Sequence, residues 1–116
     1  MGIAVPDLNQ PILKNTNAIL AFAEEEAELP PTTECIRCGR CVSHCPLILM
    51  PYEIEAAFNR GDVEAMAKLK VNICMECGCC NFICPAHRPL VQTNKLAKAM
   101  VGAYRAAQKE KEAAKK

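Results

Sequence analysis

Two runs of four cysteines constrain this 116-residue chain more than any other feature of its sequence. The runs occupy residues 35–46 and 74–85, and each reads C-x2-C-x2-C-x3-C-P. The second run repeats the first 39 residues later, with its glycine and its proline in the same register. This spacing is typical of loops that ligate two [4Fe–4S] clusters, where the fourth cysteine of each run binds the other cluster.

The pattern therefore predicts two [4Fe–4S] clusters with crossed ligands. We expect the first cluster to be bound by Cys35, Cys38, Cys41 and Cys84. We expect the second to be bound by Cys74, Cys77, Cys80 and Cys45. Gly39 and Gly78 lack a Cβ, so the backbone can approach the inorganic sulfides closely. Pro46 and Pro85 have a fixed φ and turn the chain away from the cluster.

Other uses of these cysteines are less favoured by the pattern. Structural zinc sites use two separated cysteine pairs, not two runs of four that end in Cys-Pro. Disulfides are disfavoured because the chain shows no secretory signal, and cytosolic thiols stay reduced. Cys79, the ninth cysteine, lies out of register. We interpret it as a free thiol or a small packing residue beside a cluster, with a sensing or alternative-ligand role as the other reading.

The composition favours a small domain that depends on its clusters. Apolar residues make up 51% of the chain, but they include 17 alanines and nine cysteines and only five aromatic residues. Such a thin core is marginal by burial alone. A net charge of +1 argues against nucleic acid as a partner. No apolar run approaches membrane-spanning length, so we expect a soluble chain in the cytoplasm or on the cytoplasmic side of a membrane.

We divide the chain into an N-terminal lead-in segment (residues 1–34), a dicluster ferredoxin-type domain (35–92) and a C-terminal helix with a charged tail (93–116). The lead-in is expected to be irregular or β-like, with short strands at residues 3–5 and 18–22. A run of three glutamates at residues 24–26 is interpreted as solvent-exposed.

Apolar residues at helical spacing predict two short helices between residues 51 and 70 and a longer helix after Pro89. Gly61 is expected to end the first helix, and Asp62 to cap the second. The 28 residues between the two cysteine runs disfavour a small β-sheet ferredoxin. The expected fold class is all-α, a helical dicluster ferredoxin with two loop–helix cluster-binding repeats.

With these motifs in place, the chain resembles the C subunit of the Rnf electron transport complex (RnfC), in its C-terminal dicluster region. The resemblance rests on residues 34–42, 61–62, 74–80, 84–85 and 89–92, and it extends over residues 1–28. It implies electron transfer through two [4Fe–4S] clusters in a membrane-associated complex, with the chain peripheral on the cytoplasmic face of the cell membrane. That complex passes electrons between ferredoxin and NAD and couples them to the movement of sodium ions or protons.

One departure from the family concerns the region that precedes the clusters. The family subunit carries a large part that binds flavin and NADH, and this chain has no G-x-G-x-x-G or other glycine-rich phosphate loop. The chain is therefore expected to be a fragment or a freestanding reduced relative. Its expected partners are other redox subunits, with ferredoxin or a flavin-bearing domain as the electron partner.

Two further function classes stay open from the sequence. One is the iron–sulfur subunit of another helical-ferredoxin enzyme, such as a respiratory or heterodisulfide-reductase-like enzyme. The other, less favoured, is a zinc-binding or redox-sensing interaction module. No catalytic centre is visible in the chain. His44 and His87 are interpreted as exposed imidazoles near the loops, with a proton-coupled role as the other reading.

The charges in the two cysteine loops predict unequal reduction potentials. Arg37 and Arg40 lie in the first loop. In the second loop, Glu76 is at the position equivalent to Arg37. Because reduction adds negative charge, we expect the cluster of the first loop to have the higher potential.

Overall fold

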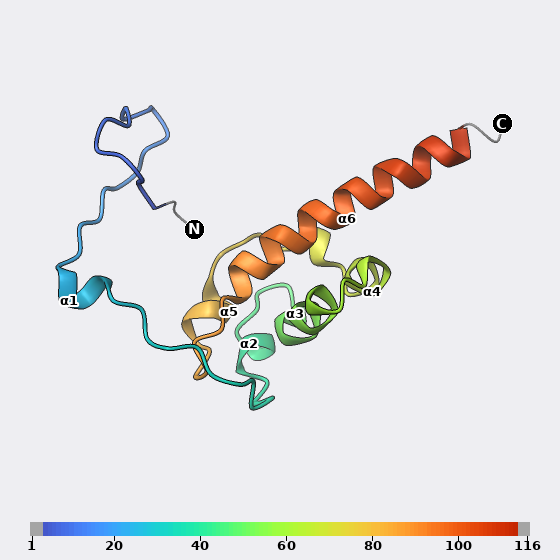
Figure 1. Ribbon diagram of the computed structural model, residues 1–116, viewed down its shortest axis with the longest axis horizontal. Helices are drawn as coiled ribbons and strands as arrows, with labels where there is room; N and C mark the ends of the chain where they lie inside the picture. The colour runs from blue at the N-terminus through green and yellow to red at the C-terminus, as the bar shows by residue number, and fades with distance from the viewer. Residues whose placement is uncertain (1–3, 114–116) are drawn as a thin grey trace. The chain divides into compact units, whose positions relative to one another are not determined.

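The computed structural model describes residues 4–113 (Figure 1). The chain divides into two units, one ending at Pro31 and the other beginning at Thr32. Their arrangement relative to one another is not determined. The finer division at residues 34 and 92 stays a prediction.

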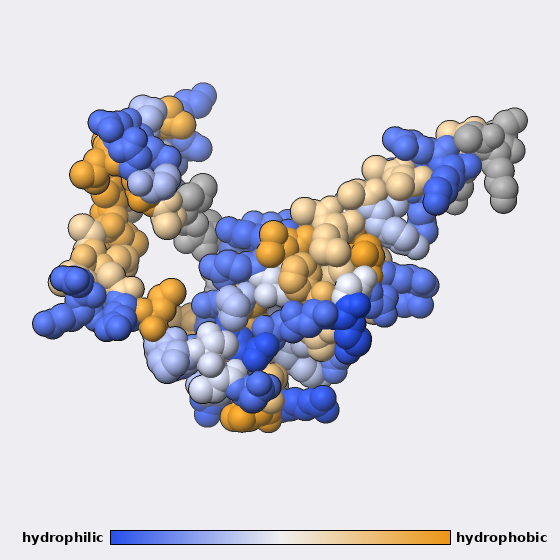
Figure 2. All heavy atoms as spheres, in the orientation of Figure 1, coloured by the Kyte–Doolittle hydropathy of each residue, from blue (hydrophilic) through white to orange (hydrophobic). Residues whose placement is uncertain are grey.

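Every described residue of the first unit is exposed to solvent. The acidic run forms one short helix, α1 (Glu24–Ala27), with all three glutamates exposed as expected. Figure 2 shows apolar residues on the surface of this unit. The expected strand at residues 18–22 is wrong, because an isolated strand without hydrogen-bonded partners is not stable in water. Of the other expected strand, Ile3 lies outside the described residues, and Ala4 and Val5 are not in a strand.

The 39-residue repeat of the cysteines extends to the backbone of the second unit. Helices α2 (Arg40–Ser43) and α5 (Cys79–Phe82) begin at equivalent positions, as do α3 (Pro51–Asn59) and α6 (Leu90–Ala113). Residues with positive φ recur in the same register, as the pairs Arg37 and Glu76, Gly39 and Gly78, and Ile48 and His87. Positive φ is uncommon in residues other than glycine. Its recurrence at three paired positions therefore shows that both loops follow the same path.

The apolar core lies where α3, α4 (Val63–Lys68) and the 3-10 helix η1 (Val71–Ile73) pack against α6. Its buried side chains are Leu49, Ile54, Ala57, Met66, Val71, Ala97 and Val101. Full burial of a side chain such as Ile54 or Met66 contributes about 1.5–3 kcal/mol. The core is small, and it lies beside the cysteine loops rather than around them.

The structure confirms the helices expected between and after the cysteine runs. Gly61, with φ +70°, lies between α3 and α4. The Asp62 carboxylate caps α4 by accepting a hydrogen bond of 2.9 Å from the backbone N–H of Ala65. Helix α6 continues into the charged tail as far as Ala113, because alanine, lysine and glutamate are good helix formers.

The expected all-α fold class is confirmed, since the described residues form helices and turns and no strand. None of the helices in this part of the chain is both long and apolar enough to span a membrane.

Candidate iron–sulfur cluster sites

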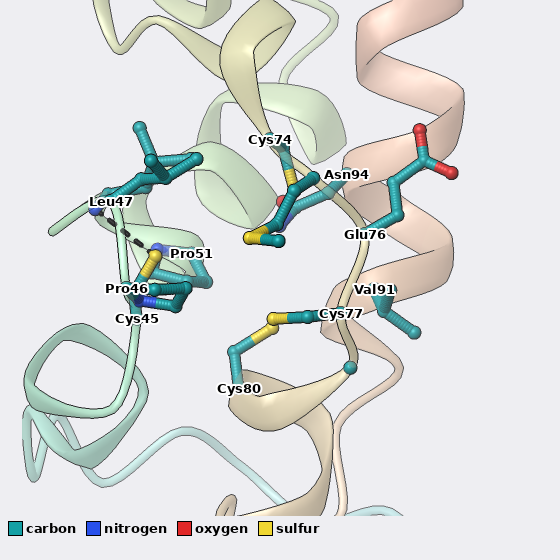
Figure 3. Close-up of a pocket in the computed structure, with 13 residues that line it drawn as sticks. Cys45, Pro46, Leu47, Pro51, Cys74, Glu76, Cys77, Cys80, Val91 and Asn94 are labelled. Atoms are coloured by element: carbon teal, nitrogen blue, oxygen red, sulfur yellow. Dashed lines mark hydrogen bonds between the residues drawn. The ribbon is translucent and has the colours of Figure 1, made fainter. Parts of the chain in front are cut away.

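Four cysteine side chains point into one hollow of the second unit (Figure 3). Three of them belong to the second run and one to the first, namely Cys74, Cys77, Cys80 and Cys45. Cys74 directly follows η1, Cys80 lies in the first turn of α5, and Cys45 follows α2. The fold thus brings together the residues that the crossed pattern predicts for the second cluster.

The other four predicted ligands surround a second hollow. They are Cys35, Cys38 and Cys41 from the first run and Cys84 from the second. The two hollows have similar volumes, about 340 and 360 Å³ measured out to the open solvent. Among residues 4–113, no three histidine, cysteine or acidic side chains converge as ligands of a single metal ion would. The cysteines surround two spaces instead.

The linings of the two hollows correspond residue by residue at the 39-residue offset. Each of the twelve residues around the hollow of Cys41 has its counterpart among the thirteen around the hollow of Cys80. The additional residue is Asn94 of α6, and its counterpart in the first repeat is Glu55 of α3. The internal symmetry therefore extends to the residues that line the two hollows, and Asn94 is the one lining residue whose counterpart does not line the other hollow.

The chemistry of the thiols fits a cationic group with several ligand positions. Burial, with the thiols of Cys74, Cys77 and Cys41 nearby, raises the pKa of Cys80 to about 11. Burial also raises the pKa of Cys41, and Cys84, Cys35 and Cys38 raise it further. Four thiolates in one hollow are unfavourable without positive charge between them. Iron in a [4Fe–4S] cluster supplies that charge and takes four thiolates.

Backbone geometry adds a second element of fit. The N–H of Leu49 donates to the Sγ of Cys45 over 3.4 Å, which is a hydrogen bond to the sulfur of a predicted ligand. Hydrogen bonds of this kind stabilise negative charge on cluster ligands. The residues present thus fit two [4Fe–4S] clusters.

The two hollows adjoin inside the second unit. Cys41 and Cys80, one from each group of four, are both buried and belong to one apolar cluster with Leu90. Helices α2 and α5 also contact one another. The two groups of cysteines are therefore neighbours across a buried apolar cluster.

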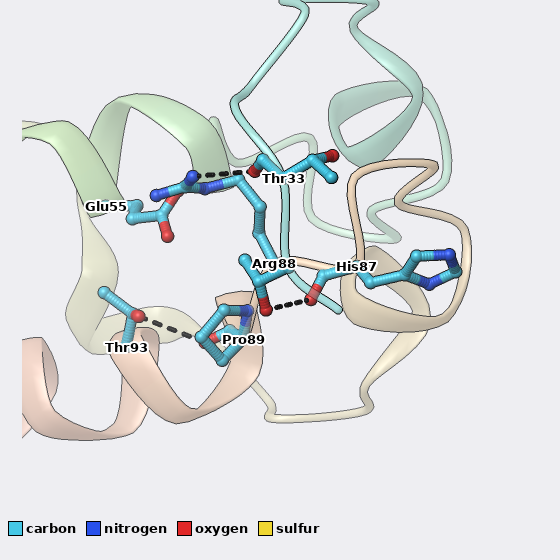
Figure 4. A network of polar contacts seen from close by, with 7 residues as sticks. Thr33, Glu55, His87, Arg88, Pro89 and Thr93 are labelled. Atoms are coloured by element: carbon cyan, nitrogen blue, oxygen red, sulfur yellow. Dashed lines mark hydrogen bonds and ion pairs between the residues drawn. The ribbon is translucent and has the colours of Figure 1, made fainter. Parts of the chain in front are cut away.

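A partly buried ion pair, between the buried Glu55 and the half-buried Arg88, lies beside the hollow of Cys41 (Figure 4). The Nε of Arg88 lies 2.6 Å from the Oε2 of Glu55, and the guanidinium also donates to the Thr33 carbonyl over 3.1 Å. The backbone N–H of Thr33 donates to the Ala86 carbonyl over 3.0 Å. These contacts hold the segment before the first cysteine run against the segment after the second.

A different ion pair lies beside the other hollow. The Nζ of Lys98 lies 2.8 Å from Glu76 Oε1 and 2.8 Å from the backbone carbonyl of Cys74. Lys98 lowers the pKa of the Glu76 carboxyl, mainly through this hydrogen bond. Figure 3 shows the Glu76 carboxylate directed away from the hollow. The negative charge of Glu76, which the sequence placed in the second loop, is therefore paired with the positive charge of Lys98 from α6.

Sequence reasoning did not identify Asn94, Lys98 or the pair of Glu55 and Arg88. Asn94 and Glu55 could have been found as polar residues on otherwise buried helix faces, equivalent at the 39-residue offset. Their partners are far away in sequence, so no local pattern indicates them.

Three residues named from the sequence lie outside both linings. His44 and His87 are exposed, as expected, and the Nδ1 of His44 lies 3.0 Å from the Arg40 carbonyl. Cys79 is exposed, and a hydrogen bond to the Cys77 thiol raises its pKa. Its interpretation as a free thiol stays a prediction.

Comparison with known proteins defines the class. Residues 34–89 match the protein family described as 4Fe-4S dicluster domain. The chain therefore contains such a domain, its cofactors are two [4Fe–4S] clusters, and the domain transfers electrons.

The particular relatives are each named as the C subunit of an ion-translocating oxidoreductase complex. The relative from Rhodobacter capsulatus is 40% identical over 98 residues, which are 84% of this chain and 19% of that protein. The relative from Pasteurella multocida is 37% identical over 116 residues, 99% of this chain and 14% of that protein. The resemblance to the C subunit of the Rnf complex is thus confirmed, and this chain spans about a fifth of the length of these relatives or less.

Proposed function

We propose that the cysteines of the two hollows hold the clusters in the crossed arrangement. One cluster is bound by Cys35, Cys38, Cys41 and Cys84, and the other by Cys45, Cys74, Cys77 and Cys80. The carrying observation is that each hollow is lined by three cysteines of one run and the last cysteine of the other. The chain's own residues hold the clusters side by side, with the buried residues Cys41, Cys80 and Leu90 between them.

Serine replacement of the fourth cysteines tests this assignment. In anaerobically reconstituted chain, Cys45→Ser should perturb the electron paramagnetic resonance signal of the cluster that Cys77→Ser also perturbs. Cys84→Ser should perturb the signal that Cys38→Ser perturbs. The unaltered chain should bind eight irons. If Cys45→Ser perturbed the signal that Cys38→Ser perturbs, crossed ligation would be contradicted. A content of about four irons per chain would contradict two clusters.

We further propose that the chain is the ferredoxin-like electron-transfer part of an Rnf-type ion-translocating oxidoreductase. Support comes from the name and identity of the relatives, which are subunits of such a complex. Its partners are other redox subunits, with ferredoxin or a flavin-bearing domain exchanging electrons. Its location is peripheral, on the cytoplasmic face of the cell membrane. Cys35 and Cys38 are exposed, so one ligand group is accessible to an electron partner.

Rapid-mixing kinetics test the electron partner. Reduced ferredoxin should reduce the reconstituted chain, whereas NADH alone should not, because no phosphate-binding glycine loop is present. A chain carrying Cys38→Ser and Cys77→Ser provides the control for non-specific reduction. Direct reduction by NADH, or no reaction with ferredoxin, would contradict the proposal. Co-sedimentation with membranes that contain the complex, compared with membranes that lack it, tests the location.

A further inference from the structure

We propose that Asn94 raises the reduction potential of the cluster at Cys74, Cys77 and Cys80, and that it does so through a hydrogen bond to Cys74. Asn94 is a positioning residue in this proposal, because it acts on the cluster through a ligand. The proposal rests on the assignment of Cys74 as a ligand, and it does not depend on which fourth cysteine completes the site.

The contact comes from a buried amide on α6. Asn94 is only 1% exposed and lines the hollow beside Cys74 (Figure 3). Its Nδ2 lies 3.7 Å from the Cys74 Sγ, within the range of hydrogen bonds to sulfur. A thiolate accepts hydrogen bonds and has no proton to donate, so the amide nitrogen is the end of the side chain that faces it.

Packing does not explain an asparagine at this position. Leu90, Ala97 and Val101 form the buried apolar face of the same helix. The Oδ1 of Asn94 is buried and has no hydrogen-bond partner among the described residues. A buried carbonyl oxygen without a partner costs stability. A leucine would fill a similar volume without that cost, so the amide is explained by what its nitrogen contacts.

The same interaction does not occur at the other hollow. Glu55, the counterpart of Asn94, is only 6% exposed, and its carboxylate is held by Arg88. A carboxylate accepts hydrogen bonds and cannot donate one to a cysteine sulfur. The amide donor is therefore a feature of one site, in a structure whose linings otherwise correspond.

The direction of the effect follows from charge. Reduction adds one negative charge, which the ligand sulfurs share. An N–H that donates to a ligand sulfur stabilises the more negative state, which is the reduced one. Asn94 therefore works against the expectation from the loop charges, which favours the cluster of the first loop. The pairing of Glu76 with Lys98 weakens that expectation further.

Redox titration of Asn94→Leu and Asn94→Ala, each as full-length reconstituted chain, tests the proposal. Cys77→Ser and Cys38→Ser identify which paramagnetic signal belongs to which site. Both Asn94 variants remove the donor, and they differ in volume. We expect a lower midpoint potential for the Cys74 site in both variants, with the other site unchanged. In the unaltered protein, an exchangeable deuteron coupled to that cluster should be visible by electron–nuclear double resonance and lost in both variants.

Asn81→Val is the matched control. The Oδ1 of Asn81 is also buried without a partner in the described part of the chain, and its counterpart in the first repeat is Val42. The Asn81 side chain donates to none of the cysteine sulfurs described, so both potentials should stay unchanged. Unshifted potentials in Asn94→Leu with eight irons bound would overturn the proposal. So would a shift only in Asn94→Ala, or failure of both variants to bind eight irons, since each indicates a packing role. Four irons in the unaltered chain would instead contradict the two-cluster assignment.

Discussion

The two cysteine repeats share a backbone and differ in their polar side chains. Each has a positive-φ residue in its loop, a short helix after the glycine and a second helix eleven residues further on. Yet Arg37 in the first loop stands where Glu76 stands in the second, and Glu55 stands where Asn94 does. The second helix is nine residues long in the first repeat and 24 in the second.

The comparison separates the residues that set the backbone path of a cluster site from the residues that set the charge around it. Cysteines, glycines and prolines set the path of both loops, because they determine ligand positions and backbone dihedrals. The residues that set local charge are Arg37 and Glu76 in the loops themselves and further residues in the segments that follow the loops. The longer α6 supplies Asn94 and Lys98 to the site at Cys74, while Arg88 and Glu55 flank the site at Cys41.

Removal of both clusters should have the largest effect, because both repeats depend on them. The apolar core is small and lies beside the loops, so ligation supplies much of the folding free energy. We expect chelation or oxidation to abolish the cooperative thermal transition and most of the helical circular dichroism. The intact protein in the same buffer is the control. A cooperative melt that is unchanged after cluster loss would contradict this prediction.

Breaking the partly buried ion pair should have the next largest effect. Glu55→Gln leaves Arg88 without its carboxylate in a largely buried position. Because Arg88 is partly exposed and keeps its hydrogen bond to Thr33, we expect a loss of about 1–3 kcal/mol of unfolding free energy, less than for a fully buried pair. Denaturant titration of the cluster-bound protein measures the loss.

Glu64→Gln is the matched control for this variant. It breaks an ion pair with Lys68 whose side chains are 66% and 75% exposed. Exposed pairs of this kind contribute little, so no measurable loss is expected. Equal losses in the two variants would show that burial does not distinguish these pairs.

The division between loop path and local charge also explains which features the sequence could predict. The cysteine spacing predicted which cysteines lie around each hollow, and helical periodicity predicted α3, α4 and the start of α6. The expected strand at residues 18–22 was wrong because apolar character alone supplies no pairing partner. The Asn94–Cys74 contact and the Glu55–Arg88 pair join residues 20 and 33 positions apart. Such pairs are decided by tertiary packing, which no local pattern records.

Loop charge should shift potentials by a smaller amount. Arg37→Gln should lower the potential of the Cys35, Cys38 and Cys41 site, on the order of 20 mV for an exposed, solvent-screened charge. Glu76→Gln should raise the potential of the other site, and Lys98→Met should lower it. The variant that carries both Glu76→Gln and Lys98→Met should have a potential near that of the unaltered protein, because the two opposite charges are removed together. Redox titration gives all four values, and a non-additive double variant would contradict simple charge compensation.

The smallest expected effect concerns the pH dependence of the Glu76–Lys98 pair, which has no equivalent in the first repeat. Lys98 lowers the pKa of the Glu76 carboxyl from its ordinary value of 4.5. A lowered pKa in the folded state means that the pair stabilises the fold above pH 4.5. That contribution is lost as the pH falls through the folded-state pKa.

We therefore expect Lys98→Met to return the Glu76 pKa towards 4.5, as measured from its carboxyl carbon-13 shift. The small stability difference between this variant and the unaltered protein should be constant near neutral pH. In acid it should fall to the contribution of the Lys98 hydrogen bond to the Cys74 carbonyl, which does not depend on the Glu76 charge. Lys68→Met, which breaks the exposed pair with Glu64, is the control and should leave the Glu76 shift unchanged. An unchanged Glu76 pKa in Lys98→Met would mean that Lys98 serves only the Cys74 carbonyl. Glu76 would then remain an uncompensated charge, and the loop charges alone would again favour the higher potential at the first site.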